Sequence, residues 1–107
     1  MTYELDPDCD LPPRLLALFL RAVPAQLQGL LKANAARDVE AARAGAHQLK
    51  GSLYAVGAST LAALLEALRK TFAAGDWSNA DAQLETIGRE FESLFAELRL
   101  RLPPGTL

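Results

Sequence analysis

Apolar residues recur at spacings of three and four in four separate segments of this chain, and this periodicity constrains the fold more than any other feature. A period near 3.6 residues places such side chains on one face of a helix, and that face must be buried. No segment shows the apolar–polar alternation that is typical of a half-buried strand. The sequence therefore predicts an all-α fold. The four sets are Leu16, Phe19, Leu20, Val23, Leu27, Leu30 and Leu31; Val39, Ala42, Ala46, Leu49, Leu53 and Val56; Leu61, Leu64, Leu65, Leu68 and Phe72; and Leu84, Ile87, Phe91, Leu94, Phe95, Leu98 and Leu102.

Turn signals divide the chain into four helices of similar length. The first is expected to begin at Pro12 or Pro13, because proline is tolerated in a first helical turn, and to run to about Asn34. Its apolar stripe stays in phase across Pro24, so we expect one helix bent at Pro24 rather than two helices. Short connections between four such helices predict an antiparallel up-down-up-down bundle.

The remaining helix ends are predicted from capping residues. Trp77 precedes the fourth helix and is expected to cover one end of the core, although a binding role is an alternative. The expected ends are Asp38 as N-cap and Gly57 as left-handed terminator of the second helix, Ser59 or Thr60 as N-cap of the third with its end near Gly75, and a capping box of Ser78 and Asp81 for the fourth with Pro103 and Pro104 after it.

Length and composition favour one domain. A chain of 107 residues with 50% hydrophobic content can bury a core without disulfides or metal. We expect a polar lead-in over residues 1–11, a bundle over 12–102 and a tail over 103–107. The net charge of −2 provides no basic surface for nucleic acid or an anionic membrane, which favours a protein partner or a small ligand.

Cysteine content and hydropathy bear on the compartment. Cys9 is the only cysteine, which excludes an internal disulfide and a thiolate metal cluster and fits a reducing compartment. The apolar run from Leu15 to Leu20 is too short to span a bilayer and lacks the layout of a signal peptide. We predict a cytoplasmic protein, and Met1 favours a free-standing chain.

His47 is the only histidine, and the helical phase predicts that it meets solvent. It lies roughly 120° round the second helix from the centre of the apolar stripe. Arg43, Lys50, Gly51 and Tyr54 lie on the same side of that helix. The imidazole is therefore expected to flank the core, with two cations nearby.

Gly51 lies one turn after His47, where a glycine costs about 1 kcal/mol relative to alanine. The absence of a side chain is interpreted as clearance for a bulky partner to reach the imidazole. Close packing of Gly51 against a neighbouring helix is the alternative.

The chemistry available to this face is nucleophilic. A neutral imidazole is a good nucleophile near neutral pH, and a phosphoryl group is an electrophile that it can accept. Lys50 could steady the phosphoryl oxygens as a mobile positive charge. The sequence has no phosphate-binding glycine loop and no carboxylate pair placed to hold magnesium beside His47. We therefore predict a passive acceptor and donor of phosphoryl groups, not an enzyme, with no cofactor of its own.

The motif around His47 resembles that of a known family. The run Ala46-His47-Gln48-Leu49-Lys50-Gly51-Ser52, followed by Val56-Gly57-Ala58 and a leucine-rich helix, is similar to the signature of histidine-containing phosphotransfer (HPt) domains of two-component phosphorelays. The resemblance extends from the first helix, with its internal proline, through the fourth. It implies that His47 is the phosphoacceptor, Lys50 the phosphoryl-supporting cation and Gly51 the small residue that gives a partner access.

The resemblance also implies the partners. Receiver domains of response regulators, or of a hybrid sensor histidine kinase, would bring a phosphorylated aspartate with their own magnesium site. His47 would accept the phosphoryl group and pass it to another receiver. Arg43, Gln48 and Tyr54 are expected to contact the partner, and Tyr54 and Leu53 make the surface bulkier than is usual for the family.

Other interpretations remain open at this point. A lone helical histidine is often structural, and a metal role lacks a recognisable ligand set. The dimerisation and phosphoacceptor region of a sensor kinase also carries a helical histidine, but an acidic residue usually follows it, whereas Gln48 follows here. A helical adaptor could bind a receiver or kinase through the His47 face without transferring anything.

The docking surface is expected to be an aliphatic and small-residue patch around His47. Parts of the first helix near Phe19, Leu20 and Val23 are candidates for this patch. The same periodicity is also satisfied if these three residues lie entirely in the core.

Overall fold

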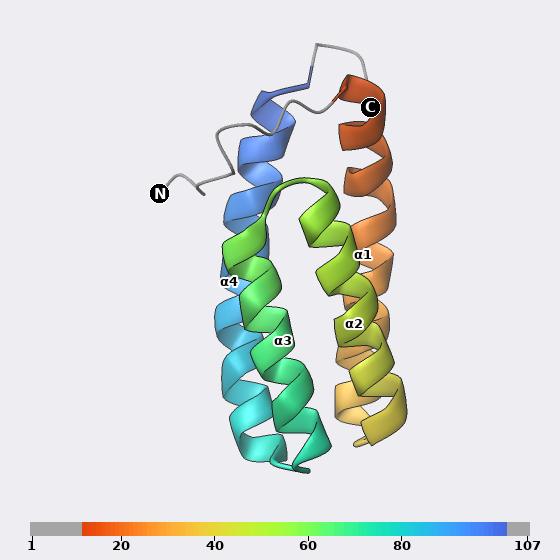
Figure 1. Cartoon of the computed structure of the whole chain (residues 1–107), viewed down its shortest axis with the longest axis vertical. Helices are drawn as coiled ribbons and strands as arrows, with labels where there is room; N and C mark the ends of the chain where they lie inside the picture. Colours follow the sequence, from red (N-terminus) through yellow and green to blue (C-terminus); the bar gives the residue numbers. More distant parts are fainter. Residues whose placement is uncertain (1–11, 103–107) are drawn as a thin grey trace.

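The computed structural model describes residues 12–102, and these form four antiparallel helices (Figure 1). Each helix packs against the next along the chain, and α4 also packs against α1, which closes the bundle. The predicted all-α, up-down-up-down architecture is confirmed. Cys9 and the expected lead-in and tail, residues 1–11 and 103–107, lie outside the described residues. The helices are α1 (Pro13–Ala35), α2 (Val39–Ala55), α3 (Ser59–Ala73) and α4 (Trp77–Leu100).

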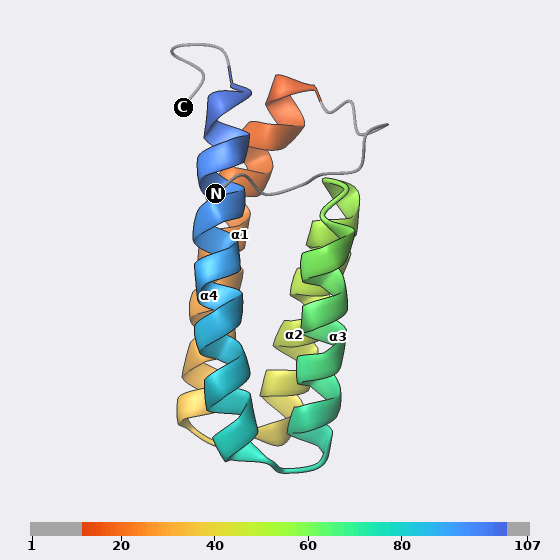
Figure 2. The same cartoon turned by 90° about the vertical axis from the view of Figure 1, so that its left-hand side faces the viewer.

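The pairs α1–α4 and α2–α3 lie on opposite sides of the bundle (Figure 2). The start of α1 and the end of α4 extend beyond the turn between α2 and α3, so one end of the bundle is formed by two helices only. In both views no other helix of the described chain covers the outward-facing side of α2 (Figures 1 and 2).

The first helix is continuous, as its uninterrupted apolar stripe predicts. It begins at Pro13 and runs through Pro24 to Ala35. By length and composition, α1 is also the one helix of the described chain that could cross a membrane. In the structure its stripe faces the bundle, because Leu16, Val23 and Leu30 are buried against the other helices.

The core runs the length of the bundle and is almost entirely aliphatic and aromatic. Most of the predicted set is buried, and Leu27, Leu64, Phe95 and Leu102 pack against the core while partly exposed. Two predictions are wrong: Val39 is half-buried outside the core cluster, and Leu31 is 38% exposed. Leu31 lies about 100° round the helix from Leu30, and only Leu30 points inward. The largest fully buried side chains are Phe72, Phe91, Leu30, Leu49, Leu53, Leu61, Leu65, Leu68, Ile87, Leu94, Leu98 and Val23.

The turn between α2 and α3 is closed by backbone hydrogen bonds. Asp38 caps the start of α2 as predicted, and Gly57 ends it with a positive φ of 73°. The N-cap of α3 is Ala58, not Ser59 or Thr60. Ala58 is fully buried, and its N–H donates to the carbonyl of Leu53 at 2.9 Å. The buried Ala58 side chain and the hydrogen bond from Ala58 to Leu53 fix the turn. The third helix therefore begins directly at Ser59, without a side-chain cap.

The capping box predicted for α4 is also wrong. The N-cap is Asp76, two residues before Ser78, and its carboxylate accepts a hydrogen bond from the Asn79 N–H at 3.2 Å. Asp81 instead reaches across the bundle end and accepts from Asn34 at 2.8 Å. Asp81, which the local pattern assigned to a helix cap, is therefore used in a hydrogen bond between α4 and α1 instead.

Trp77 covers the end of the core opposite the α2–α3 turn. Its ring lies 5.7 Å from that of Phe72, and the Arg37 guanidinium lies 5.3 Å from the indole centroid. Arg37 also forms an ion pair with Asp81 at 3.1 Å. Hydrogen bonds from Arg37 and then Asn34 hold the pKa of Asp81 below its ordinary value. The predicted covering role of Trp77 is confirmed.

Candidate functional site

His47 lies on the outer face of α2, near the middle of the helix, and is exposed to solvent. The helix forms there because Asp38 caps it and its apolar stripe is buried against α1 and α3. Ala46 and Leu49, on either side of His47 in the sequence, are almost completely buried. The structure confirms that the imidazole is exposed, and a histidine sealed in the core is excluded.

The two flanks of His47 differ in chemistry. At about 100° per residue, Arg43 and Lys50 fall on the flank that faces α3, whereas Gly51 and Ala55 fall on the flank that faces α1. Contacts agree with this division, because Lys50 bonds a residue of α3 and Ala55 borders a groove shared with α1. We refer to these as the cation flank and the small-residue flank.

Lys50 on the cation flank is bonded to a carboxylate, not mobile as the sequence suggested. Its Nζ donates to Oε2 of Glu66 at 3.0 Å, and its side chain is 22% exposed. Arg69 binds the same carboxylate, with Nε on Oε2 at 3.0 Å and Nη2 on Oε1 at 2.6 Å. Hydrogen bonds from Arg69 and then Lys50 lower the pKa of Glu66 from 4.5 to about 2. Glu66 is therefore a carboxylate shared by two cations across the α2–α3 seam.

A shallow surface hollow of about 360 Å³ borders His47 on this flank. The side chains that line it include two arginines, Arg43 from α2 and Arg69 from α3. An anion on the imidazole would therefore meet positive charge from both helices. The lining residues are Glu40, Arg43, Ala44, His47 and Arg69.

Sequence reasoning identified Arg43 as a partner residue but did not identify Glu66 or Arg69. The three-residue spacing of Glu66 and Arg69 indicates a pair on one side of α3. The sequence around Glu66 and Arg69 does not indicate that this side of α3 faces His47, because that depends on how α2 and α3 are aligned in the bundle.

Gly51 on the small-residue flank stands in open space. A Cβ built on Gly51 would meet no atom within 4 Å, beyond the local helix backbone. Close packing of Gly51 against another helix, the alternative explanation, is therefore wrong. The open surface agrees with the clearance interpretation, while the role of Gly51 in partner access stays a prediction.

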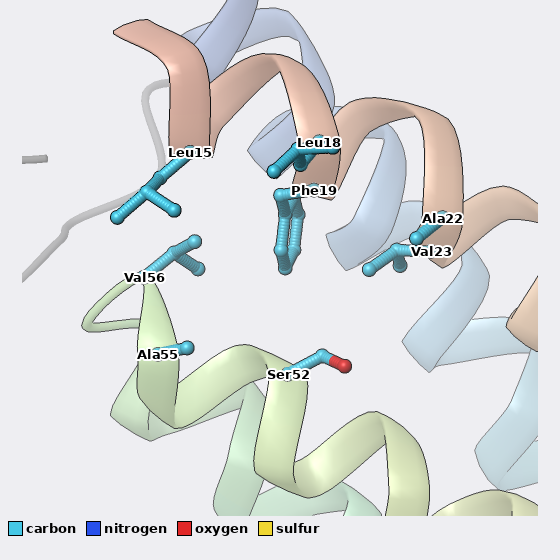
Figure 3. Close-up of a pocket in the computed structure, with 8 residues that line it drawn as sticks. All are labelled: Leu15, Leu18, Phe19, Ala22, Val23, Ser52, Ala55 and Val56. Carbon is cyan, nitrogen blue, oxygen red and sulfur yellow. The ribbon is translucent and has the colours of Figure 1, made fainter. Parts of the chain in front are cut away.

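An apolar groove of about 220 Å³ lies beyond Gly51, between α1 and the end of α2 (Figure 3). Leu15 and Leu18 line one wall and are 48% and 53% exposed. Ala55, the last residue of α2, and Val56, which follows it, line the opposite side, as Figure 3 shows. About 12 Å of helix separates His47 from Ala55, so the groove continues the small-residue flank.

The expected docking residues of α1 need correction. Phe19, Leu20 and Val23 are at most 9% exposed, so the assignment that places them in the core is right. Phe19 and Val23 reach only the floor of the groove. Leu15 and Leu18 supply its exposed surface, because each lies outside the buried stripe of α1.

Gln48 and Tyr54 are both exposed on α2, and Tyr54 is 58% exposed. Gln48 borders a second hollow between α2 and α1, which Gln26 also lines. Ser52 donates a hydrogen bond to Gln26 across the same seam at 3.0 Å. The positions suit contact with a partner, and that contact stays a prediction. Within residues 12–102, no three His, Cys, Asp or Glu side chains gather into a possible metal site.

Comparison with known proteins agrees with this geometry. A sequence model of the Hpt domain matches residues 14–101. The chain is similar to the crystal structure of histidine-containing phosphotransfer protein B (HptB) from Pseudomonas aeruginosa PAO1, with a TM-score of 0.78 and 30% sequence identity over 83% of this chain and 77% of that one. No curated protein matches the sequence. The helical bundle, the exposed histidine and the matched span agree, and the chain belongs to the Hpt family, whose members are phosphocarriers that act by histidine phosphotransfer in phosphorelays.

Proposed function

We propose that this protein is a cytoplasmic phosphorelay intermediary that accepts a phosphoryl group from a receiver-domain aspartate onto His47 and passes it to another receiver. The observation that carries the proposal is the position of the imidazole. His47 is exposed on α2 between a cation flank and a flank without side-chain bulk. A nucleophile so placed can be approached closely by a second protein.

The transfer step is a displacement at phosphorus. A ring nitrogen of neutral His47 attacks the phosphorus of the aspartyl phosphate, and the bond between phosphorus and the carboxyl oxygen breaks. The aspartate leaves as a carboxylate, and the phosphorylated ring then releases its excess proton to solvent. Transfer onward reverses these bonds on a second aspartate. This chain supplies the nucleophile and nearby positive charge, while the receiver supplies its magnesium site and the alignment of the reacting groups.

The small-residue flank is the proposed docking side. A receiver that contacts His47 must pass over Gly51, where no side chain stands in the way. Beyond Gly51 it would meet Leu15 and Leu18, which are exposed at the groove. An apolar surface of the receiver would bury these leucines, and exposed apolar patches of this kind are typical of protein interfaces. Arg43, Gln48 and Tyr54 would then lie at the edge of the contact.

The test is transfer from a receiver phosphorylated on its aspartate. The wild-type chain should acquire an acid-labile label, as expected for a phosphoramidate, whereas His47→Gln should acquire none. His47 is exposed, so the far-UV circular dichroism of the variant should match wild type. Labelling that survives in His47→Gln would refute the proposal. Binding of the receiver without any labelling of the wild type would support the adaptor instead.

A further inference from the structure

The cation flank holds more positive charge than Lys50 alone. Arg43 and Arg69 border the hollow beside the imidazole, together with Glu40. A phosphoryl group carries between about 1.5 and 2 negative charges at neutral pH. The donors that reach into this hollow therefore determine how a phosphorylated His47 is held.

Glu66 fixes Arg69 through one edge of the guanidinium. Nε and Nη2 each donate to a different oxygen of the carboxylate, at 3.0 and 2.6 Å. A guanidinium carries five N–H donors in a rigid plane, and this fork engages two of them. Three donors therefore remain for a second acceptor. The Arg69 side chain lines the same hollow as His47 and Glu40, so a phosphoryl group on the ring would enter the hollow that these donors border.

Lys50 is placed differently, although it lies only three residues after His47. Its ammonium donates to Glu66, and its side chain lies outside the set that lines the hollow. Recruiting Lys50 to a phosphoryl group would require movement away from Glu66. Arg69 can bind the same group while its pair with Glu66 stays intact.

Building on the phosphocarrier function proposed above, we propose that Arg69 binds the phosphoryl group on His47, and that Glu66 is a positioning residue that holds its guanidinium at the hollow. Lys50 then acts mainly by anchoring Glu66. Positive charge is in this way supplied to the α2 histidine from α3, by a residue that can bind two oxygens at once.

Chemical phosphorylation tests this assignment without a receiver. In the reaction with phosphoramidate, a ring nitrogen of His47 attacks phosphorus, the P–N bond of the donor breaks, and ammonia leaves. Because His47 is the only histidine among 107 residues, the phosphohistidine signal in ³¹P NMR reports one site. A bound cation lowers the midpoint of the ³¹P titration with pH. Arg69→Gln should raise this midpoint by roughly 0.5 to 1 pH unit, and Arg69→Lys should keep it near the wild-type value.

Two matched variants separate contact from net charge. Lys70→Gln removes one charge from the next position on α3, and Lys50→Gln removes one from the cation flank of α2. Both should shift the midpoint less than Arg69→Gln does. An equal or larger shift in either variant would overturn the assignment.

The wild-type protein provides a measurement that needs no variant. The Nη–H resonances of Arg69, which include the donors not engaged by Glu66, should shift when His47 is phosphorylated, and unchanged Nη–H resonances would overturn the assignment. Failure of the relay itself would look different. A phosphorylated receiver would then not label His47, while the chemically phosphorylated protein would still show the response to Arg69.

Discussion

Substitution of Gly51 should change stability and phosphoryl transfer in opposite directions. Glycine inside a helix is about 1 kcal/mol less favourable than alanine. A Cβ at Gly51 meets nothing within 4 Å, so no steric cost offsets this gain. Gly51→Ala should therefore raise the free energy of unfolding by about 1 kcal/mol. For a domain of this size, the melting temperature should rise by roughly 4 to 8 °C.

A longer side chain at the same position should block the partner. Gly51→Gln should also be at least as stable as wild type, because glutamine is a better helix former than glycine. Its side chain would stand one turn from His47, on the flank proposed to admit the receiver. Misplacement of the reacting groups by about 1 Å can cost about 100-fold in rate. We expect receiver-to-His47 transfer to slow by roughly 10- to 100-fold, measured by rapid-quench labelling.

Gly88 in α4 provides the matched control. A Cβ built there also meets nothing within 4 Å, and Gly88 does not border either flank of His47. Gly88→Gln should gain the same stability and transfer at the wild-type rate. Phosphorylation of Gly51→Gln by phosphoramidate should be normal, since that small donor needs no docking surface. Wild-type transfer in Gly51→Gln, or marked destabilisation of it, would refute the clearance argument.

Two further changes test the cation flank. Lys50→Ala should slow receiver-to-His47 transfer by about fivefold without abolishing it, because Glu66 then loses one of its two cation partners, a contact worth up to about 1 kcal/mol; complete loss of labelling would contradict this. The pKa of Glu66 is lowered from 4.5 to about 2 by Arg69 and Lys50, so the ionised carboxylate stabilises the fold above pH 4.5 and this contribution is lost as the pH falls towards 2. The stability difference between wild type and Glu66→Gln, from urea denaturation, should thus shrink across that range, and a difference independent of pH would argue against the pairing.

The parts of the fold that depend on local periodicity could be predicted from the sequence. The apolar positions before and after Pro24 lie on one helical face, and they correctly predicted one continuous helix. The position of His47 relative to the apolar face of α2 correctly predicted that it is exposed. Both features follow from helical geometry within a single segment. The prediction that Leu31 is buried was wrong, because Leu31 lies at the edge of the apolar face of α1. Whether a residue at that edge is covered depends on how the neighbouring helices pack.

The features that depend on contacts between helices could not be predicted in this way. Asp81 fits a capping box by spacing, yet it bonds Asn34, which lies 47 residues earlier in the chain. Arg69 reaches the His47 hollow only because α3 packs beside α2 in one particular alignment. The pairing of Lys50 with Glu66 has the same origin. A single sequence contains the residue types for these contacts but not the alignment that joins them.

The arrangement of the bundle separates stability from the chemistry of the exposed face. The core is closed by apolar side chains that point away from the outer face of α2, so His47 and Gly51 contribute little to the packing. Glu66 is the exception, because it joins α2 to α3 through Lys50 and also holds Arg69 at the hollow. Substitution at His47 should therefore alter transfer alone, and substitution at Gly51 should alter stability only through the helix propensity of the new residue. A substitution at Glu66 should alter both the stability of the α2–α3 seam and the charge beside the imidazole. This coupling identifies Glu66 as the position where folding and phosphoryl binding depend on the same contacts.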